Sequence, residues 1–310
     1  MNWRYKGALQ RAIGRAPGGD LLHYYVQRYA GGLRDLGGEL TAKLEDWRLM
    51  VGHLGTAGIS VAGTRFFEMG TGWYPTFPMC LYLGGAASVD TIDLTRHMRA
   101  DLTLDAAEWL GWQTAAIAVA TRQPAGEIER RHSRLLDALR TGASIEDASS
   151  GVIRYRAPGD ASRTALPEHT LDVVFSNSVL EHVPGPVIAA CFTEARRILR
   201  PGAVMFQSVN CGDHYAYTDK SIDQLNYLRF SDDEWRQWDN KFLYQNRLRA
   251  IDFTTMARAA GFTVELDTSR PHPTRLAQLE KTPVHPSFTA KYARDQLAIT
   301  SIDFVARAPR

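Results

Sequence analysis

The chain has few of the residues that build disulfide frameworks and zinc sites. Only three cysteines occur among its 310 residues, at Cys80, Cys191 and Cys211, and no two of them have Cys-x-x-Cys spacing. An odd number of cysteines cannot be fully paired, and no metal-binding spacing is present. We therefore expect neither a disulfide framework nor a structural zinc site, and we expect a reducing, cytoplasmic location.

An excess of charge of one sign is also missing. Lys and Arg total 36 and Asp and Glu total 34, which leaves a net charge of +2, and no long Lys/Arg tract occurs. A protein that binds nucleic acid usually carries a basic face, so this balance argues against a nucleic-acid partner. The 45% of hydrophobic residues is enough for a sizeable core in a chain of this length.

Long hydrophobic runs are absent as well. The best apolar run, residues 115–120, is far shorter than the ~20 residues that span a bilayer as a helix. Residues 1–6 are not followed by the apolar segment of a secretory signal peptide. We expect no membrane span.

Two glycines follow a short apolar run that ends in an acid, in the sequence FFEMGTGW at residues 66–73. This pattern predicts a strand that leads into a ligand-binding turn, in which Gly70 permits the tight turn and Gly72 lets the backbone approach a ligand. A second predicted strand ends at Asp93, about 20 residues further on, where a carboxylate can accept hydrogen bonds from both ribose hydroxyls of an adenosine. The two features together predict a nucleotide-like ligand.

The dinucleotide fingerprint and the P-loop are both incomplete. A dinucleotide site needs a small residue three positions after Gly72, but Pro75 stands there. No Gly-Lys-Ser or Gly-Lys-Thr occurs anywhere in the chain. These gaps argue against NAD and against a P-loop nucleotide.

Further motifs follow in order: GDA at 159–161, LDVVFSN at 171–177, SVLEHV at 178–183 and EARRILRPGA at 194–203. With the first motif, they resemble the class I S-adenosylmethionine-dependent methyltransferases of the small-molecule type. The resemblance covers about 60–98 and 151–210, with a weaker match at 256–264. Tyr74 stands where the family often has a third glycine, which changes the floor of the pocket.

The pattern of strands and helices, with this resemblance, predicts a doubly wound, mostly parallel, seven-stranded Rossmann-like α/β sheet. We expect strands near 64–68, 88–93, 152–156, 171–176, 203–209, 262–266 and 299–307, and the resemblance implies that the last runs antiparallel. Residues 1–55 predict an N-terminal helical cap. The methyltransferase domain would then occupy 56–310, with insertions at about 99–150 and 210–250.

The two insertions have different expected roles. The first predicts two or three helices that extend the core, form the face of a possible homodimer, or help to bind an acceptor. The second begins beyond the carboxyl end of a strand, where ligands of open α/β sheets bind, so we expect it to form the acceptor pocket. The candidate acceptor-binding residues are Asp213, Tyr215, Trp235, Tyr244 and Arg247. Trp235 and Trp238 are alternatively the apolar seam of a lid helix.

The resemblance also implies a cofactor, S-adenosylmethionine, and a set of residues to bind it. Glu68 would join the network around the methionine amino group, and Asp160 would contact the adenine amino group. As alternatives, Glu68 caps a turn and Asp160 is an ordinary turn residue. The full cofactor set is Glu68, Gly70, Thr71, Gly72, Asp93, Leu94, Asp160, Ala161, Ser176 and Asn177.

Methyl transfer to an alcohol needs a base, and two histidines follow strands at the ligand edge. His182 follows the fourth strand and His214 the fifth. We favour His214 because it begins the second insertion and lies beside Asp213, which could orient it. His182 alternatively packs at the start of a helix. Glu181 and Asp213 are a further alternative, as ligands of a divalent metal, but we assign no metal.

These features predict an S-adenosylmethionine-dependent methyltransferase with a small-molecule acceptor. The acceptor would be a hydroxyl of a natural product, a glycan precursor or a sugar-containing lipid. Enzymes that methylate amino groups of nucleic acids typically carry Asn/Asp-Pro-Pro-aromatic after the fourth strand, where this chain reads SNSV at 176–179. An N- or C-methyltransferase on the same fold and a non-catalytic cofactor-binding scaffold are the alternatives.

Overall fold

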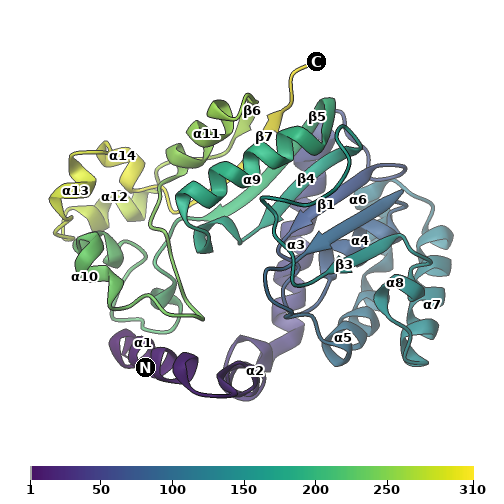
Figure 1. The fold of residues 1–310 in the computed structure, drawn as a ribbon, viewed down its shortest axis with the longest axis horizontal. Coiled ribbons are helices and arrows are strands. Elements are labelled where there is room, and N and C mark those ends of the chain that lie inside the picture. Colours follow the sequence, from purple (N-terminus) through teal and green to yellow (C-terminus); the bar gives the residue numbers. More distant parts are fainter. Residues whose placement is uncertain (1) are drawn as a thin grey trace.

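A computed structural model describes residues 2–310 and contains one sheet of seven strands (Figure 1). The strand order is β3-β2-β1-β4-β5-β7-β6, and the strands from β3 to β5 in that order are all parallel, whereas β7 runs antiparallel to both of its neighbours. The strands are β1 (Arg65–Met69), β2 (Ser88–Ile92), β3 (Ile153–Arg156), β4 (Leu171–Asn177), β5 (Leu199–Asn210), β6 (Thr263–Asp267) and β7 (Ser301–Arg307). The predicted doubly wound sheet and its antiparallel last strand are confirmed.

Helices cover both faces of this sheet because the central strands are apolar on both sides. In β1, Phe66 belongs to one core and Phe67 to the other, as the alternation of side chains along a strand requires. One face carries α9 (Gly185–Ile198) and α11 (Ala250–Ala259). The other face carries α3 (Leu36–Thr56), α4 (Thr76–Leu83), α5 (Ala100–Leu110), α6 (Thr114–Thr121), α7 (Ala125–Arg140) and α8 (Ile145–Ala148).

The first insertion extends the core. Leu102, Leu110, Ile128 and Leu135 are fully buried and join the same apolar cluster as β1 and α3. This is the first of the three roles expected for the segment.

The predicted N-terminal cap divides into two parts. Helix α3 begins after Asp35, whose side chain accepts from the Gly38 backbone N–H, and it buries Leu44, Trp47 and Met50 in the main core. Only α1 (Trp3–Arg15) and α2 (Gly19–Ala30) extend away from the sheet, along the bottom of the view in Figure 1.

Helix α1 packs against the second insertion through aromatic side chains. Trp3 is buried and its ring contacts those of Tyr215, Trp235 and Trp238 at centroid distances of 5.5, 5.7 and 4.8 Å. The insertion, with α10 (Asp232–Arg236), shares this apolar cluster with the C-terminal segment that contains α12 (Pro273–Leu279), α13 (Pro286–Thr289) and α14 (Arg294–Leu297). We call this assembly of residues 211–249 and 273–297 with α1 the aromatic lobe.

Within residues 2–310, no helix is both long and apolar enough to cross a membrane.

The depth of α3 in the core predicts a large effect of truncating Met50. Met50 is fully buried, whereas its neighbour Leu49 is 54% exposed. Met50→Ala should lower the free energy of unfolding by about 2–5 kcal/mol, because it leaves a cavity among packed side chains. Leu49→Ala is the matched control and should change it by less than about 0.5 kcal/mol. Denaturant unfolding measures both, and equal small effects would show that α3 is not part of the core.

Candidate active site

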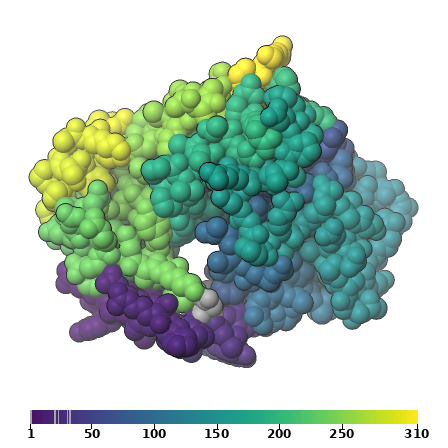
Figure 2. Space-filling model, viewed as in Figure 1, coloured from purple at the N-terminus to yellow at the C-terminus, as the bar shows by residue number. Residues whose placement is uncertain are grey.

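A cleft of about 890 Å³ lies at the carboxyl edge of the parallel strands. Its walls come from the segments at the ends of β1, β2, β3 and β4 and from α2, α3, α4 and α9, with one residue, Phe242, from the aromatic lobe. Figure 2 shows the hollow between the N-terminal helices and the body of the molecule. This is the edge where open α/β sheets bind ligands.

The glycine turn after β1 needs both of its glycines, for different reasons. Gly70 and Gly72 have φ of +84° and +77°, a backbone region that other residues rarely adopt. A Cβ on Gly70 would lie 2.5 Å from Cγ2 of Val179, whereas a Cβ on Gly72 would meet nothing within 4 Å. Gly70 therefore allows close packing against the segment after β4, and Gly72 leaves open space for a ligand.

Asp93 lies directly after β2 and faces this turn. Its carboxylate accepts from the Gly72 backbone N–H at 3.3 Å and from the Tyr155 hydroxyl at 2.9 Å. Burial raises the pKa of Asp93, and the hydrogen bonds from Tyr155 and Gly72 oppose that rise. The two contacts fix the carboxylate at the cleft wall and leave lone pairs for the hydroxyls of a ribose.

Glu68 lies one residue before the end of β1 and is fully buried. Its Oε2 accepts from the Thr91 hydroxyl at 2.5 Å. Burial raises the pKa of Glu68 to about 8, although the Thr91 hydrogen bond and the positive charge of Lys43 act in the opposite direction. A cation bound beside such a carboxyl group would further stabilise its charged form.

Most of the other predicted cofactor residues also line the cleft, namely Thr71, Leu94, Asp160, Ala161 and Asn177. Asp160 is exposed and accepts from the Ser162 backbone N–H and hydroxyl, which together lower its pKa. Ser176 does not line the cleft, and we correct its assignment. Its side chain is fully buried, and its hydroxyl donates to Oε1 of Gln207 on the neighbouring strand β5.

The predicted acceptor residues lie inside the aromatic lobe and not on the cleft. Asp213 is fully buried and accepts from the Tyr215 backbone N–H and from Asn226. Tyr215 is buried too, and its hydroxyl donates to the Trp238 carbonyl at 2.8 Å. These two side chains stabilise the lobe, so neither is available to an acceptor.

Of the other three predicted acceptor residues, Trp235 and Arg247 are likewise used within the lobe. Trp235 is buried among the lobe's aromatic rings, as the packing alternative expected. Arg247 is buried and donates to the carbonyls of Tyr227 and Phe230 and to Asp232. Tyr244 contributes its backbone carbonyl, which accepts from His182 Nδ1 at 2.7 Å.

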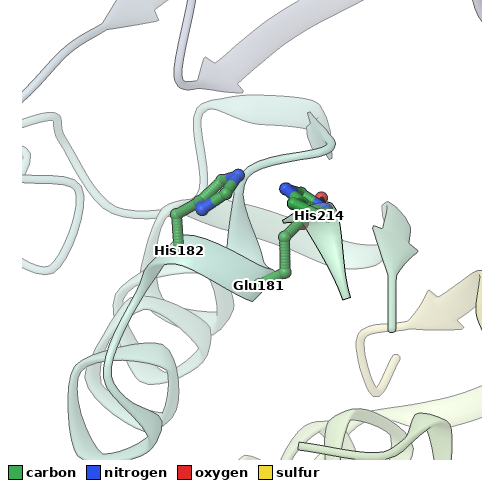
Figure 3. Close-up of side chains that lie close together, drawn as sticks. All are labelled: Glu181, His182 and His214. Carbon is green, nitrogen blue, oxygen red and sulfur yellow. Dashed lines mark ion pairs between the residues drawn. The ribbon is translucent and has the colours of Figure 1, made fainter. Parts of the chain in front are cut away.

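The two candidate histidines lie together, with Glu181 beside them (Figure 3). His182 lines the cleft at the end of η3 (Leu180–His182), and His214 begins η4 (His214–Tyr217) after β5. Their ring centroids are 4.9 Å apart, and His214 Nε2 lies 4.0 Å from Glu181 Oε1. We refer to these three side chains as the Glu-His-His cluster.

Burial keeps both imidazoles neutral. It lowers the pKa of His214 to about 3, with further lowering by His182 and Lys6. It also lowers the pKa of His182, which the hydrogen bond to the Tyr244 carbonyl partly opposes. His214 is thus a weak base that does not line the cleft, which reverses our preference for it over His182.

The sequence reasoning missed the contribution of α3. Glu39 and Lys43 line the cleft, and Asp46 accepts from Asn177 Nδ2 at 3.1 Å. These residues form a polar stripe at helical spacing beside the buried stripe of Leu40, Leu44 and Trp47. The polar stripe could be read from the sequence, but the sequence did not indicate which part of the sheet helix α3 would contact.

Comparisons with known proteins found one family model and a set of solved structures. A family model described as "Methyltransferase domain" matches residues 135–206. No curated protein matches the chain. Among solved structures, an S-adenosylmethionine-dependent methyltransferase from Mesorhizobium loti is similar at a TM-score of 0.45 and 15% identity, covering 80% of this chain and 93% of that one.

Two other solved structures have similar values. A SAM-dependent methyltransferase from Methanosarcina mazei has a TM-score of 0.42 and 14% identity, covering 81% of this chain and 94% of that one. A phosphoethanolamine N-methyltransferase from Haemonchus contortus has a TM-score of 0.44 and 17% identity, covering 86% of this chain and 53% of that one.

The chain carries a methyltransferase domain, and its fold and motifs are those expected of an S-adenosylmethionine-dependent methyltransferase. The strand order with its antiparallel β7 and the matched methyltransferase domain confirm the fold, the enzyme class and the cofactor that the motifs predicted. The residues present fit the cofactor, because Asp93 suits a ribose, Glu68 suits an ammonium group and Gly72 leaves the turn open.

Removing the Asp93 carboxylate should weaken cofactor binding. Asp93→Ala should weaken binding of S-adenosylhomocysteine by about 1.5–3 kcal/mol, the range for hydrogen bonds to a charged group. Tyr155→Phe is the matched control, since it removes the hydroxyl that holds Asp93 but keeps the carboxylate, and its effect should be smaller. Isothermal titration calorimetry measures both, and unchanged affinity in Asp93→Ala would show that the carboxylate does not bind the ribose.

Glu68 predicts that cofactor binding releases a proton. Near pH 7 the unliganded carboxyl is mostly protonated because its pKa is about 8, and an ammonium group bound beside it favours the charged form. Affinity should therefore increase as pH rises toward 8. Calorimetry in buffers of different ionisation enthalpy counts the released protons, and Glu68→Gln should abolish the release. Equal proton release by Glu68→Gln and the unchanged protein would assign it to another group.

Proposed function

We propose that this methyltransferase methylates a hydroxyl oxygen of a small molecule bound in the cleft. A hydroxylated natural product, a glycan precursor or a sugar-containing lipid fits this description. The observation that carries the proposal is a neutral imidazole, His182, on the cleft wall and held in a single tautomer. Its Nδ1 donates to the Tyr244 carbonyl, so its Nε2 carries a free lone pair.

The size of the cleft supports a two-ligand site. Its volume of about 890 Å³ is near the upper end of the ~300–1,000 Å³ found for small-molecule sites. The part nearest the glycine turn suits the cofactor. The part bounded by His182, Val187 and Phe242 is the remaining space for an acceptor.

The reaction assigns definite tasks to the residues of the chain. When bound, S-adenosylmethionine supplies a methyl group on a positively charged sulfur. Asp93 and Glu68 bind and orient the ligand, while His182 faces the hydroxyl and accepts its proton. The oxygen lone pair forms the new bond to carbon, and the electrons of the broken carbon–sulfur bond stay on sulfur. Holding the two reactants close and aligned supplies much of the rate.

Methylation of an amine or a carbon remains the runner-up. An acceptor screen that follows S-adenosylhomocysteine release, with the methylated atom identified by NMR, separates these chemistries. Products methylated only at nitrogen or carbon would contradict the hydroxyl proposal and leave the enzyme class unchanged.

Replacing His182 should slow the reaction without weakening cofactor binding. His182→Ala should lower kcat by about 10²-fold or more, because it removes the group that takes the hydroxyl proton. His272→Ala is the matched control, since this exposed imidazole lies at the start of α12 and not on the cleft. Steady-state kinetics and calorimetric affinity for S-adenosylhomocysteine are the measurements. Normal turnover in His182→Ala would remove His182 from the mechanism.

A further inference from the structure

The Glu-His-His cluster brings three metal-binding side chains to one point. One ligand atom from each of Glu181, His182 and His214 lies within 4.8 Å of the other two (Figure 3). They come from two segments that follow adjacent parallel strands, β4 and β5, so the fold itself holds them together. His214 belongs to the aromatic lobe, whereas the first insertion and the glycine turn contribute none of the three.

Part of this cluster is buried without a partner. Glu181 is 3% exposed, and no side chain among residues 2–310 donates to its carboxylate, which only the backbone N–H groups of Glu181 itself and Asn210 approach. The Nε2 of His214 is buried without a hydrogen-bond partner among the same residues. Burying an imidazole nitrogen unpaired beside a carboxyl group that lacks side-chain donors is costly, and native proteins rarely tolerate it unless an ion or water completes the site.

We propose that Glu181, His182 and His214 bind a divalent first-row transition-metal ion, with Zn²⁺ as the reference ion. Two neutral imidazoles and one carboxylate form a donor set used by catalytic zinc sites, whereas Mg²⁺ and Ca²⁺ prefer oxygen ligands alone. An ion at the centre of the three atoms would lie at most about 2.8 Å from each. Small side-chain rotations would bring those distances to the ~2.0–2.2 Å of zinc sites.

The surroundings orient the ligands. The hydrogen bond from His182 Nδ1 to the Tyr244 carbonyl leaves Nε2 to bind the ion, an arrangement common among metal-binding histidines. The Gln245 side chain holds the segment of His214, because it accepts from the His214 backbone N–H and donates to the Gly212 carbonyl, both at 2.9 Å. Lys43 influences Glu181 only through its charge, since it makes no hydrogen bond to either oxygen.

The catalytic role of this site rests on the proposed hydroxyl acceptor and changes the task of His182, because its Nε2 then holds the ion and the ion, not the imidazole, activates the hydroxyl. Three protein ligands leave a coordination position open, and His182 places that position at the cleft wall. A hydroxyl of the acceptor that binds there has a lowered pKa and a fixed oxygen. Its proton then leaves to solvent, while the oxygen forms the bond to the methyl carbon and sulfur keeps the electrons of the broken bond. The metal ion is neither oxidised nor reduced.

Direct metal binding tests the site without any assumption about the acceptor. The full chain is stripped with EDTA, dialysed and titrated with Zn²⁺ by calorimetry, and with Co²⁺ by absorption spectroscopy. We expect one equivalent to bind, with a Co²⁺ spectrum of nitrogen and oxygen ligands. Glu181→Gln and His214→Ala should each weaken the affinity about tenfold or more. His97→Ala, which removes another cleft histidine, should not.

Circular dichroism of each variant shows whether it is folded. If His214→Ala does not fold, the near-isosteric Glu181→Gln still provides the test. Absence of binding to the folded, unchanged chain overturns the proposal, as does equal affinity in Glu181→Gln.

Activity then tests the catalytic role. With a hydroxyl acceptor, the metal-free chain should turn over at least about 10²-fold more slowly than the Zn²⁺-loaded chain. Equal rates would overturn the catalytic role while leaving the binding site in place. If no hydroxyl acceptor is methylated by either form, the proposed function fails, and the Zn²⁺ titration alone still decides the site.

Discussion

The placement of three carboxyl groups at one edge of a parallel sheet is the constraint on which this active site depends. Glu68 lies near the end of β1, Asp93 after β2 and Glu181 after β4, and these strands are neighbours at the centre of the sheet. All three carboxyl groups are largely removed from water, and burial raises the pKa of each. Keeping such groups charged requires positive or hydrogen-bonding partners. The edge is therefore suited to a ligand that carries positive charge, such as a sulfonium with an ammonium group.

The aromatic lobe lies opposite this edge and limits the cleft on its other side. Its own interior is held by Trp3 from the N-terminus and by Arg249, which is fully buried and donates to the carbonyls of Cys211 and Ile299. Because most polar side chains of the lobe are used in this way, it contributes to the site mainly through backbone groups, Phe242 and His214. Any selectivity for the acceptor then depends on the shape of the cleft and on the few polar groups that line it.

The fold was predictable from the sequence because its signals are local. The central strands β1 and β4 contain short apolar runs beside turn residues, and the glycine turn with Asp93 identified the cofactor edge. The acceptor side was not predictable in the same way. Trp235 and Arg247 have the composition of a binding surface, and only the tertiary packing shows that their partners are other lobe residues. Likewise, Asp213 adjoins His214 in sequence but bonds to Asn226, whereas Glu181 reaches the histidine from another strand.

A crystal structure with S-adenosylhomocysteine tests the central claim most directly, because it locates every group of the ligand relative to the three carboxyl groups. The account predicts that the ribose hydroxyls contact Asp93, that the amino group lies within hydrogen-bonding distance of Glu68, and that the sulfur faces the part of the cleft bounded by His182. A ligand bound away from the Gly70–Gly72 turn, or bound there with its amino group remote from Glu68, would contradict it.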